Sequence, residues 1–258
     1  RASTGIFNGD DAEVVARATH WQGRKVFFSL DTPGPGEIGV VEELLVDRAF
    51  VSDPQEAAMI SEVIDVIPTV PHNVANALAA AGLARAVGVN HAPIQAALQK
   101  FKLGRHRIEN IFSKDEINWV DDSKATNPHA AAASLMATLS AIWIAGGMAK
   151  GAEMSELISR CKSRIKTAIL IGADRELIAA ELRAQAPNIE ILYIDAPVSY
   201  QRGGGDNSLM EEVVKAAKVR AVAGDTVLLA PACASMDQFI SYADRGDRFA
   251  KAVLKENS

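Results

Sequence analysis

Short apolar segments alternate regularly with amphipathic segments from Gly104 onward. Each apolar segment has the length and aliphatic content of a buried strand, and the segments between them repeat apolar residues at helical spacing. The pattern predicts strands over 117–120, 141–145, 168–171, 191–194 and 226–229, and helices over 128–139, 153–162, 175–184, 208–222 and 237–254. Such alternation is typical of a doubly wound, mostly parallel α/β sheet of the Rossmann-like type.

The first 103 residues have a less regular pattern, so we expect a separate domain with its boundary near Leu103. The pattern in this part predicts a strand ending within 6–10, a helix over 12–19, a strand over 25–30, two short strands within 37–51, and helices over 73–87 and 91–101. The turn sequence PGPG at 33–36 separates the strands. This part of the chain is also of the α/β class.

One uncharged stretch, residues 130–149, approaches the length of a membrane span. Serine, threonine and paired glycines interrupt it, and Asn127-Pro128 is typical of a helix N-cap followed by a first-turn proline. We therefore expect a buried helix that leads into a buried strand, and no membrane partner.

The composition narrows the functional classes. Of the 258 residues, 48% are hydrophobic and 23% are charged, which is typical of a globular protein with a substantial core. The net charge of −5 disfavours a nucleic-acid partner. Two cysteines without metal-binding spacing suit a reducing, cytoplasmic environment. The chain opens without Met and without a secretory signal pattern, so we expect a truncated or processed protein.

Three predicted strand ends lead into loops that carry polar residues. The loop after 117–120 contains Asp122 and Lys124, the glycine turn after 141–145 presents Lys150, and the turn after 226–229 contains Ser235. Ligands of open parallel sheets lie at the carboxyl ends of the strands, and helix N-termini there bind anions. The residues themselves predict an anion site and leave the ligand open.

Each of these elements also has a structural explanation. Ser235 and Gln238 have the spacing of a capping box, so the serine can serve only to begin a helix. Asp122 and Lys124 can be a solvated surface pair worth less than about 1 kcal/mol. Lys150 follows two glycines, but the spacing is not that of a phosphate-binding loop.

The amino-acid sequences of these loops resemble those of the Mur ligase family. The shared motifs are HNVANA at 72–77, GRHRIE at 104–109 and DSKATN at 122–127, and the resemblance extends from about Asn73 to the end. The more selective runs are PACASMDQF at 231–239 and RGDRF at 245–249, which are similar to the branch that adds D-glutamate. One departure is the sequence GGMAK at 146–150, where the family usually has GGDGK.

The resemblance implies a domain organisation. Residues 1–103 would be the carboxyl-terminal part of a central P-loop-type ATP-binding domain, and residues 104–258 a carboxyl-terminal amino-acid-binding domain. No phosphate-binding loop pattern occurs in the sequence, so that loop is expected upstream of Arg1. The ligands of Mg²⁺ are not identifiable within this sequence.

Roles for individual residues are also implied by the resemblance. Asn76, Arg107 and Asp122 would bind ATP, Lys124 and Lys150 would be catalytic, and Thr126, Lys150, Ala234, Ser235, Met236 and Tyr242 would bind D-glutamate. The backbone N–H groups around Ala234 and Met236 would take part. Asn73 and Asn76 can instead line a helix start, and Tyr242 can instead be a core residue.

The implied activity is ATP- and Mg²⁺-dependent ligation of D-glutamate to UDP-N-acetylmuramoyl-L-alanine, by a monomer, in the synthesis of peptidoglycan precursors. The carboxylate of the first substrate would attack the γ-phosphate of ATP, and the amine of D-glutamate would then attack the resulting acyl phosphate. Two alternatives stay open here: another Mur or folylpolyglutamate-type ligase, and a non-catalytic α/β binding domain.

Overall fold

The computed structural model describes residues 3–53, 55–198, 200 and 206–258. The chain forms two compact units, residues 1–102 and residues 103–258. Each is an α/β unit with its own sheet and its own hydrophobic core.

Unit 1 is built on a five-stranded sheet in the order β1-β2-β3-β4-β5. Its first three strands are parallel and its last two pairings are antiparallel. The core lies between this sheet and the last two helices, where Leu78 and Ile94 meet Ile38 and Leu45. The elements are β1 (Thr4–Asn8), α1 (Ala12–Ala18), β2 (Arg24–Phe28), β3 (Ile38–Val41), β4 (Leu44–Asp47), β5 (Ala58–Glu62), the 3₁₀ turn η1 (Val63–Asp65), α2 (Pro71–Ala86) and α3 (His91–Lys100).

Unit 2 is built on a six-stranded sheet in the order β10-β9-β8-β11-β7-β6. Five strands are parallel, and β6 pairs antiparallel with β7 at one edge. The elements are β6 (Glu109–Lys114), β7 (Ile117–Asp121), α4 (Pro128–Met136), β8 (Ala141–Gly146), α5 (Ser155–Cys161), η2 (Lys162–Arg164), β9 (Ile165–Ile171), α6 (Arg175–Gln185), β10 (Glu190–Tyr193), α7 (Ser208–Arg220), β11 (Thr226–Leu229) and α8 (Tyr242–Asn257). The predicted doubly wound, mostly parallel sheet is confirmed.

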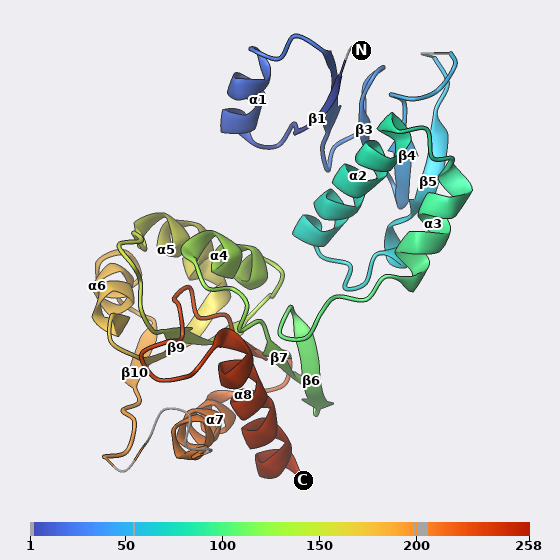
Figure 1. The fold of residues 1–258 in the computed structure, drawn as a ribbon. Helices are drawn as coiled ribbons and strands as arrows, with labels where there is room; N and C mark the ends of the chain where they lie inside the picture. Colours follow the sequence, from blue (N-terminus) through green and yellow to red (C-terminus); the bar gives the residue numbers. More distant parts are fainter. Residues whose placement is uncertain (1–2, 54, 199, 201–205) are drawn as a thin grey trace. The chain divides into compact units, whose positions relative to one another are not determined.

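Helices cover both faces of this sheet, as Figure 1 shows: α4, α5 and α6 on one face, and α7 and α8 on the other. The alternation of side chains along β8 explains why both faces are apolar. Ala141, Trp143 and Ala145 enter the first core, whereas Ile142 and Ile144 enter the second. A fully buried parallel strand therefore has no polar position.

The uncharged stretch 130–149 contains most of α4 and all of β8, so it is a helix that leads into a strand, as the sequence predicts. The N-cap is confirmed as well, because the side chain of Asn127 accepts a hydrogen bond from the Ala130 N–H and Pro128 occupies the first turn. No helix in the described part of the chain combines the length and the apolar character that crossing a membrane requires.

Three predictions about elements need correction. The strands β5 and β6 are absent from the predicted set. The last helix begins at Tyr242 and not at residue 237, because residues 232–241 form an irregular turn instead of a helical one.

Candidate functional site

The carboxyl ends of three neighbouring strands bring the polar loops together. Strand β11 lies between β7 and β8 and is parallel to both, so Leu229 is paired with Asp121 on one side and with Ile144 on the other. The loops at 122–127, 147–154 and 230–241 therefore leave adjacent positions at one edge of the sheet (Figure 1). The expectation that these loops share one edge is confirmed.

Two of the loops are joined through their backbones. The Met148 N–H donates to the Ala234 carbonyl at 2.8 Å, and the Ala234 N–H donates to the Met148 carbonyl at 2.9 Å. This pairing requires the glycine at 147, because its φ is +128° and a Cβ there would overlap with the Ala234 carbonyl oxygen. The loop after β8 is therefore held against the loop after β11.

Asp122 is buried and its carboxylate contacts protein groups. It accepts hydrogen bonds from the Ser134 hydroxyl on α4 and from the Ile108 N–H. Burial raises the pKa of Asp122 to about 6, although these two hydrogen bonds oppose the shift. A solvated surface pair with Lys124 is therefore the wrong description of Asp122, because only 7% of this residue is exposed.

The raised pKa of Asp122 predicts a pH-dependent stability of known sign. The folded state holds a proton more tightly than the unfolded state, so this group's contribution to stability falls as the pH rises from about 4 to above 6, by roughly 3 kcal/mol. We expect Asp122→Asn to stabilise the chain more at pH 7.5 than at pH 4.5. Urea unfolding at the two pH values measures the difference.

A control residue whose pKa shift has the opposite sign is Asp225, at the other end of the sheet. Burial alone would raise the pKa of Asp225, but hydrogen bonds from Lys166, Ser140 and the Val222 N–H outweigh burial and lower it. Asp225→Asn should therefore cost nearly the same stability at pH 7.5 and at pH 4.5, because the stabilising contribution of this carboxylate is lost only as the pH falls below about 4. An equal effect of Asp122→Asn at both pH values would show that its carboxylate is not held protonated by burial.

Lys124 lies against an aromatic ring. Its ammonium nitrogen is 4.0 Å from the centroid of the Tyr242 ring, and its backbone N–H donates to the His106 carbonyl at 3.1 Å. A cation over a tyrosine face is attracted by the ring quadrupole. Tyr242 is half-buried at the first turn of α8, so the alternative that it is simply a core residue is not what the structure shows.

The other residues assigned to D-glutamate lie in the same three loops. Lys150 is exposed on a turn with φ +53°, and its side chain has no hydrogen bond or ion pair within the described residues. Thr126 is half-buried at the end of the loop after β7, and its N–H donates to the Lys124 carbonyl. Met236 is 53% exposed on the loop after β11. The structure thus gathers the predicted residues at one edge of unit 2.

Two details of the predicted D-glutamate site are wrong. The Ala234 N–H is engaged by the Met148 carbonyl, so it is not available to bind a carboxylate. Ser235 begins no helix: its carbonyl accepts the N–H groups of Gln238 and Phe239 within a short turn, and α8 begins seven residues later. The proposed helix N-terminus at Ser235 therefore supplies no anion site.

The true cap of α8 is Ser241, whose side chain accepts the Asp244 N–H at 3.1 Å. We expect Ser241→Ala to lower the free energy of unfolding by about 1 kcal/mol. Ser235→Ala should lower it by less than Ser241→Ala does, because it removes no cap. Thermal or urea unfolding of the two variants tests this contrast, and a larger loss from Ser235→Ala would restore the capping interpretation.

The residues assigned to ATP are found in both units. In unit 1, Asn76 is exposed on α2 and lines an apolar pocket of about 350 Å³ between α2 and α3, whereas the Asn73 amide donates to the Pro68 carbonyl at the helix start. In unit 2, Arg107 is exposed two residues before β6. The assignment of these residues to ATP stays a prediction.

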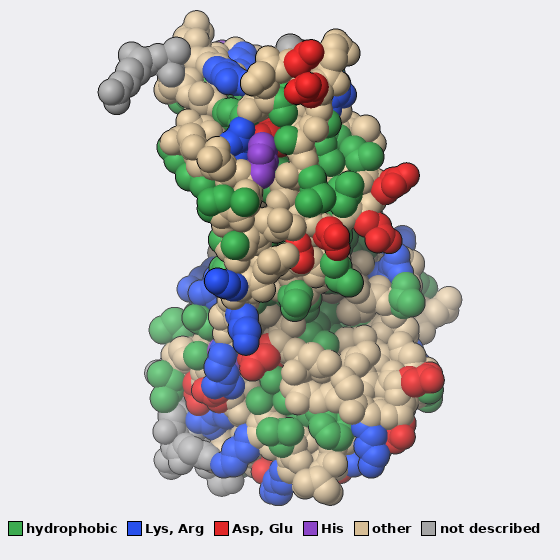
Figure 2. All heavy atoms as spheres, turned by 90° about the vertical axis from the view of Figure 1, so that its right-hand side faces the viewer, with side chains coloured by type: hydrophobic (Ala, Val, Ile, Leu, Met, Phe, Trp, Pro, Cys, Tyr) green, Lys and Arg blue, Asp and Glu red, His purple; other side chains and the backbone are tan. Residues whose placement is uncertain are grey.

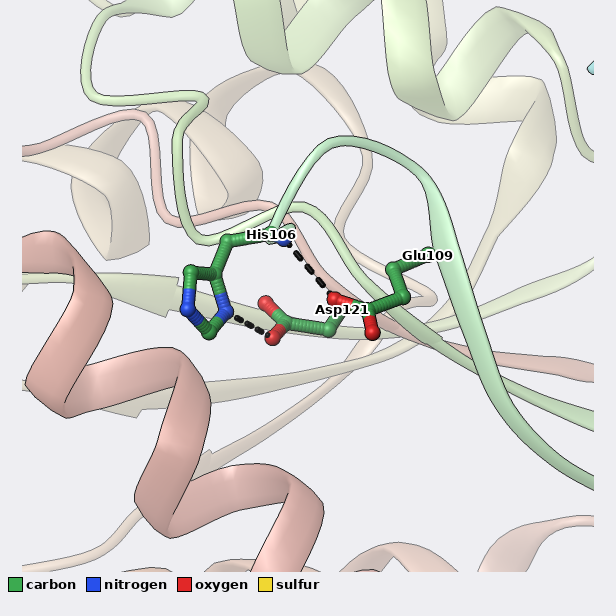
Figure 3. Close-up of side chains that lie close together, drawn as sticks. All are labelled: His106, Glu109 and Asp121. Atoms are coloured by element: carbon green, nitrogen blue, oxygen red, sulfur yellow. Dashed lines mark hydrogen bonds and ion pairs between the residues drawn. The ribbon is translucent and has the colours of Figure 1, made fainter. Parts of the chain in front are cut away.

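A buried polar cluster at the start of unit 2 is absent from the predicted site. His106 contacts Asp121 through Nδ1 at 2.7 Å, and its backbone N–H donates to Glu109 at 2.9 Å (Figure 3). Three such groups can bind a metal ion, but here each is already satisfied by a neighbour, and the Arg105 guanidinium lies 3.7 Å from Glu109. The cluster therefore orders the loop before β6.

Comparison with known proteins finds a matching family model and similar curated proteins. Residues 106–233 match the family model described as "Mur ligase, glutamate ligase domain". The chain is 51% identical over 231 residues to a protein of Streptomyces avermitilis, and 52% identical over 231 residues to one of Streptomyces coelicolor. Both are named UDP-N-acetylmuramoylalanine–D-glutamate ligase, and both alignments cover 89% of this chain. They cover 48% and 47% of the two relatives, so the chain spans about half of their length.

Solved structures share the fold at low sequence identity. A pseudomurein peptide ligase type C from Methanothermus fervidus has a TM-score of 0.61 at 16% identity, over 98% of this chain and 56% of that one. A structure of MurF from Acinetobacter baumannii has a TM-score of 0.61 at 15% identity, over 98% of this chain and 52% of that one. With the family match over residues 106–233 of unit 2 and about 50% identity to the curated relatives, this chain belongs to the Mur ligase family.

Proposed function

We propose that this chain is the carboxyl-terminal half of an ATP-dependent ligase that adds D-glutamate to UDP-N-acetylmuramoyl-L-alanine. The observation that carries the proposal is the 51% identity over 231 residues to a protein of that name. The selective run at 231–239 supports it, because that run forms the loop after β11 that is paired with the lysine-bearing loop after β8.

In this proposal the edge of unit 2 binds the incoming amino acid. Lys150 and Lys124 each carry a positive charge in a loop that follows a parallel strand, and D-glutamate carries two carboxylates. A lysine acts on a carboxylate as a compact point charge. Ser235 and Thr126 would add hydroxyl donors from the flanking loops. Holding both carboxylates would direct the amine of D-glutamate toward the acyl phosphate.

The chemistry requires few covalent roles from the protein. The carboxylate of UDP-N-acetylmuramoyl-L-alanine attacks the γ-phosphate of ATP, ADP leaves, and the D-glutamate amine then displaces phosphate from the acyl phosphate. Positioning and charge neutralisation account for most of the catalysis of phosphoryl transfer. Mg²⁺ would neutralise the phosphates, and we assign none of its ligands to this chain. Asn76, Arg107 and Asp122 are proposed ATP contacts, the last through the ribose.

We further propose that the domain before Leu103 is part of the ATP-binding domain, that the ligase is a cytoplasmic monomer, and that it acts in peptidoglycan precursor synthesis. The division into units at residue 102 and the two buried free cysteines are compatible with this proposal. Since no phosphate-binding loop pattern occurs within the 258 residues, the chain by itself would lack the means to activate ATP.

Phosphate release from ATP in the presence of UDP-N-acetylmuramoyl-L-alanine tests the proposal. The full-length ligase that contains this chain should release phosphate only when D-glutamate is added, and L-glutamate, L-lysine and meso-diaminopimelate should not replace it. Residues 1–258 alone should be inactive in the same assay. Turnover that prefers another amino acid would reject the proposed substrate, and turnover by residues 1–258 would reject the role of an upstream phosphate-binding loop.

A further inference from the structure

Arg245 on α8 is a completely buried arginine, with 0% of its surface exposed. It forms no salt bridge with a carboxylate in the part of the chain that the structure describes. Its guanidinium instead donates five hydrogen bonds to backbone carbonyls and to one hydroxyl. Burial lowers the pKa of Arg245 to about 10, so it remains charged at neutral pH. A buried charge of this kind is tolerated only when its donors are satisfied.

The acceptors come from the ends of three different strands. Nε and Nη2 donate to the hydroxyl and the carbonyl of Ser123 at 2.9 and 3.0 Å, in the loop after β7. Nη1 donates to the carbonyl of Gly146 at 3.4 Å, at the end of β8. Both Nη atoms donate to the carbonyl of Cys233 at 3.2 Å, in the loop after β11. One side chain therefore ties together the three loops that hold the candidate site.

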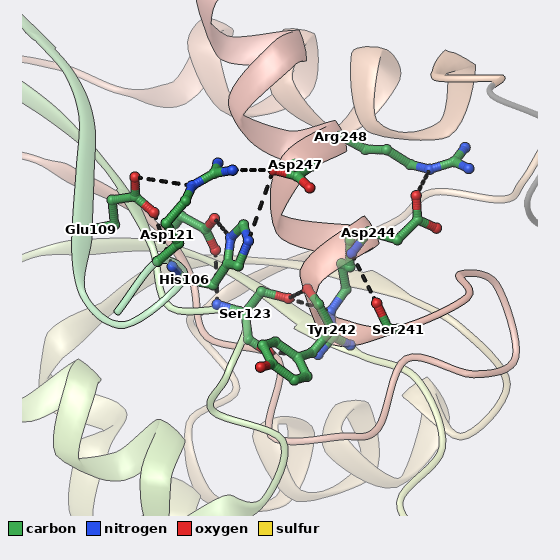
Figure 4. A network of polar contacts seen from close by, with 11 residues as sticks. His106, Glu109, Asp121, Ser123, Ser241, Tyr242, Asp244, Asp247 and Arg248 are labelled. Atoms are coloured by element: carbon green, nitrogen blue, oxygen red, sulfur yellow. Dashed lines mark hydrogen bonds and ion pairs between the residues drawn. The ribbon is translucent and has the colours of Figure 1, made fainter. Parts of the chain in front are cut away.

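The hydrogen-bond network of Arg245 also includes the start of α8. The Ser123 hydroxyl, which accepts from Arg245, donates to the Tyr242 carbonyl at 2.7 Å. Figure 4 shows Ser123 lying beside Tyr242 at the beginning of this helix, with His106 and Asp121 next to them. The adjacent Gly246 permits this packing, because a Cβ there would overlap with the His106 ring.

The residues that accept hydrogen bonds from Arg245 are close in sequence to the proposed D-glutamate contacts. Lys124 follows Ser123 directly, Ser235 lies two residues after Cys233, and Lys150 lies four residues after Gly146. Moving any one of the three loops relative to the others would therefore change the spacing of the groups that would hold the two carboxylates. Orientation of a bound reactant is sensitive to displacements of this kind.

We infer that Arg245 is a positioning residue that fixes the three loops relative to one another and thereby sets the affinity for D-glutamate. The inference rests on the proposed function for the identity of the ligand. A lysine cannot replace Arg245, because a single ammonium group lacks the planar fork that reaches acceptors in three directions.

A matched control lies one turn further along the same helix. Arg248 is also buried, but it donates to Asp244 at 2.8 Å, to the Asp206 carbonyl and to the Tyr200 hydroxyl. Figure 4 shows it directed toward Asp244 and away from Ser123. Its guanidinium also lies over the Phe239 ring in the loop after β11, 6.0 Å from the ring centroid, a cation–π contact that lysine can still make. Arg248→Lys therefore alters a buried arginine of α8 that donates no hydrogen bond to the three loops.

The test uses the full-length ligase and two readouts. Arg245→Lys should raise the Michaelis constant for D-glutamate roughly tenfold or more, with less than about a threefold change for ATP. The ATP constant should change less because Asp122 is held separately by Ser134 and Ile108. Hydrogen exchange of the backbone amides in all three loops should increase together. Arg248→Lys should produce neither effect, and Ser123→Ala, which removes one acceptor, should shift the D-glutamate constant in the same direction by a smaller factor.

Several results would overturn the inference. One is a D-glutamate constant that stays unchanged in Arg245→Lys while stability falls, since that is the behaviour of a purely structural residue. Another is an equal rise of the D-glutamate and ATP constants. If Arg245→Lys does not fold, an unchanged D-glutamate constant in Ser123→Ala overturns it. A wild-type ligase that does not respond to D-glutamate rejects the proposed function by itself, and the exchange data, which need no substrate, then decide whether Arg245 fixes the loops.

Discussion

Replacing Lys150 with alanine is expected to raise the Michaelis constant for D-glutamate roughly 10- to 100-fold in the full-length ligase, because a hydrogen bond to a charged group contributes about 1.5–3 kcal/mol. The lysine is exposed at the carboxyl edge of the sheet, and its ammonium group makes no hydrogen bond or ion pair with another described residue. It is therefore available to a ligand. The constant for ATP should change much less. Initial-rate kinetics with each substrate varied separately measure both constants.

The matched control is Lys251→Ala, which removes an exposed lysine from α8. It should leave both constants unchanged. A rise in the ATP constant without a rise for D-glutamate would move Lys150 from the amino-acid site to the phosphates, and the carboxylate clamp would then rest on Lys124.

Replacing Gly147 with alanine is expected to destabilise the chain by roughly 3 kcal/mol. Overpacking costs about 1–3 kcal/mol, and an unfavourable backbone angle adds about 1 kcal/mol. Both terms apply here, since φ is +128° and the new Cβ would overlap with the Ala234 carbonyl that pairs with Met148. Urea unfolding measures the loss.

Gly151 separates the two terms. It lies in the same loop with φ +81°, and a Cβ there would meet nothing within 4 Å. Gly151→Ala should therefore show only the backbone cost, about 1 kcal/mol. If Gly147→Ala is no more destabilising than Gly151→Ala, the two loops are not held as closely as the Met148–Ala234 pairing requires.

The parallel strands of unit 2 could be predicted because their environment is uniform. A strand covered by helices on both faces has no polar position, so it appears in the sequence as a short continuous apolar run bounded by loops. The predicted strand over 226–229 has the same bounds as β11. Strand β6 has no such run: it lies at the edge, pairs with only one neighbour and contains a register shift near Asn110. Its pattern is therefore interrupted where the structure has a strand.

The start of α8 shows where local signals are insufficient. Ser235 with Gln238 and Ser241 with Asp244 both have the spacing of a serine cap, and only the second one caps a helix. Which serine caps the helix depends on a partner distant in sequence, because Ala234 in the loop after β11 pairs with Met148 in the loop after β8. Helix formation from Ser235 would have to accommodate that pairing. Sequence reasoning within a short window contains no information about it.

The loops of the candidate site were predicted from chain order and turn residues, whereas the residues that order those loops were not. His106 and Arg245 lie in motifs quoted for their resemblance, yet nothing in their neighbourhood indicates that either side chain is buried. An arginine in an amphipathic helix is usually exposed. The burial of Arg245 results from the meeting of three strand ends, which is a property of the sheet and not of the helix.

The position of β11 has a consequence for the order in which the site is made during synthesis. This strand is the last of its sheet along the chain, but it occupies the centre, between β7 and β8. While the ribosome is still adding it, β7 and β8 have no neighbour on their facing edges, and the acceptors of Arg245 are not yet assembled. Pairing of this kind between distant segments forms late and slowly. A nascent chain that stops before β11 would therefore expose two unpaired central strand edges, which are templates for aggregation.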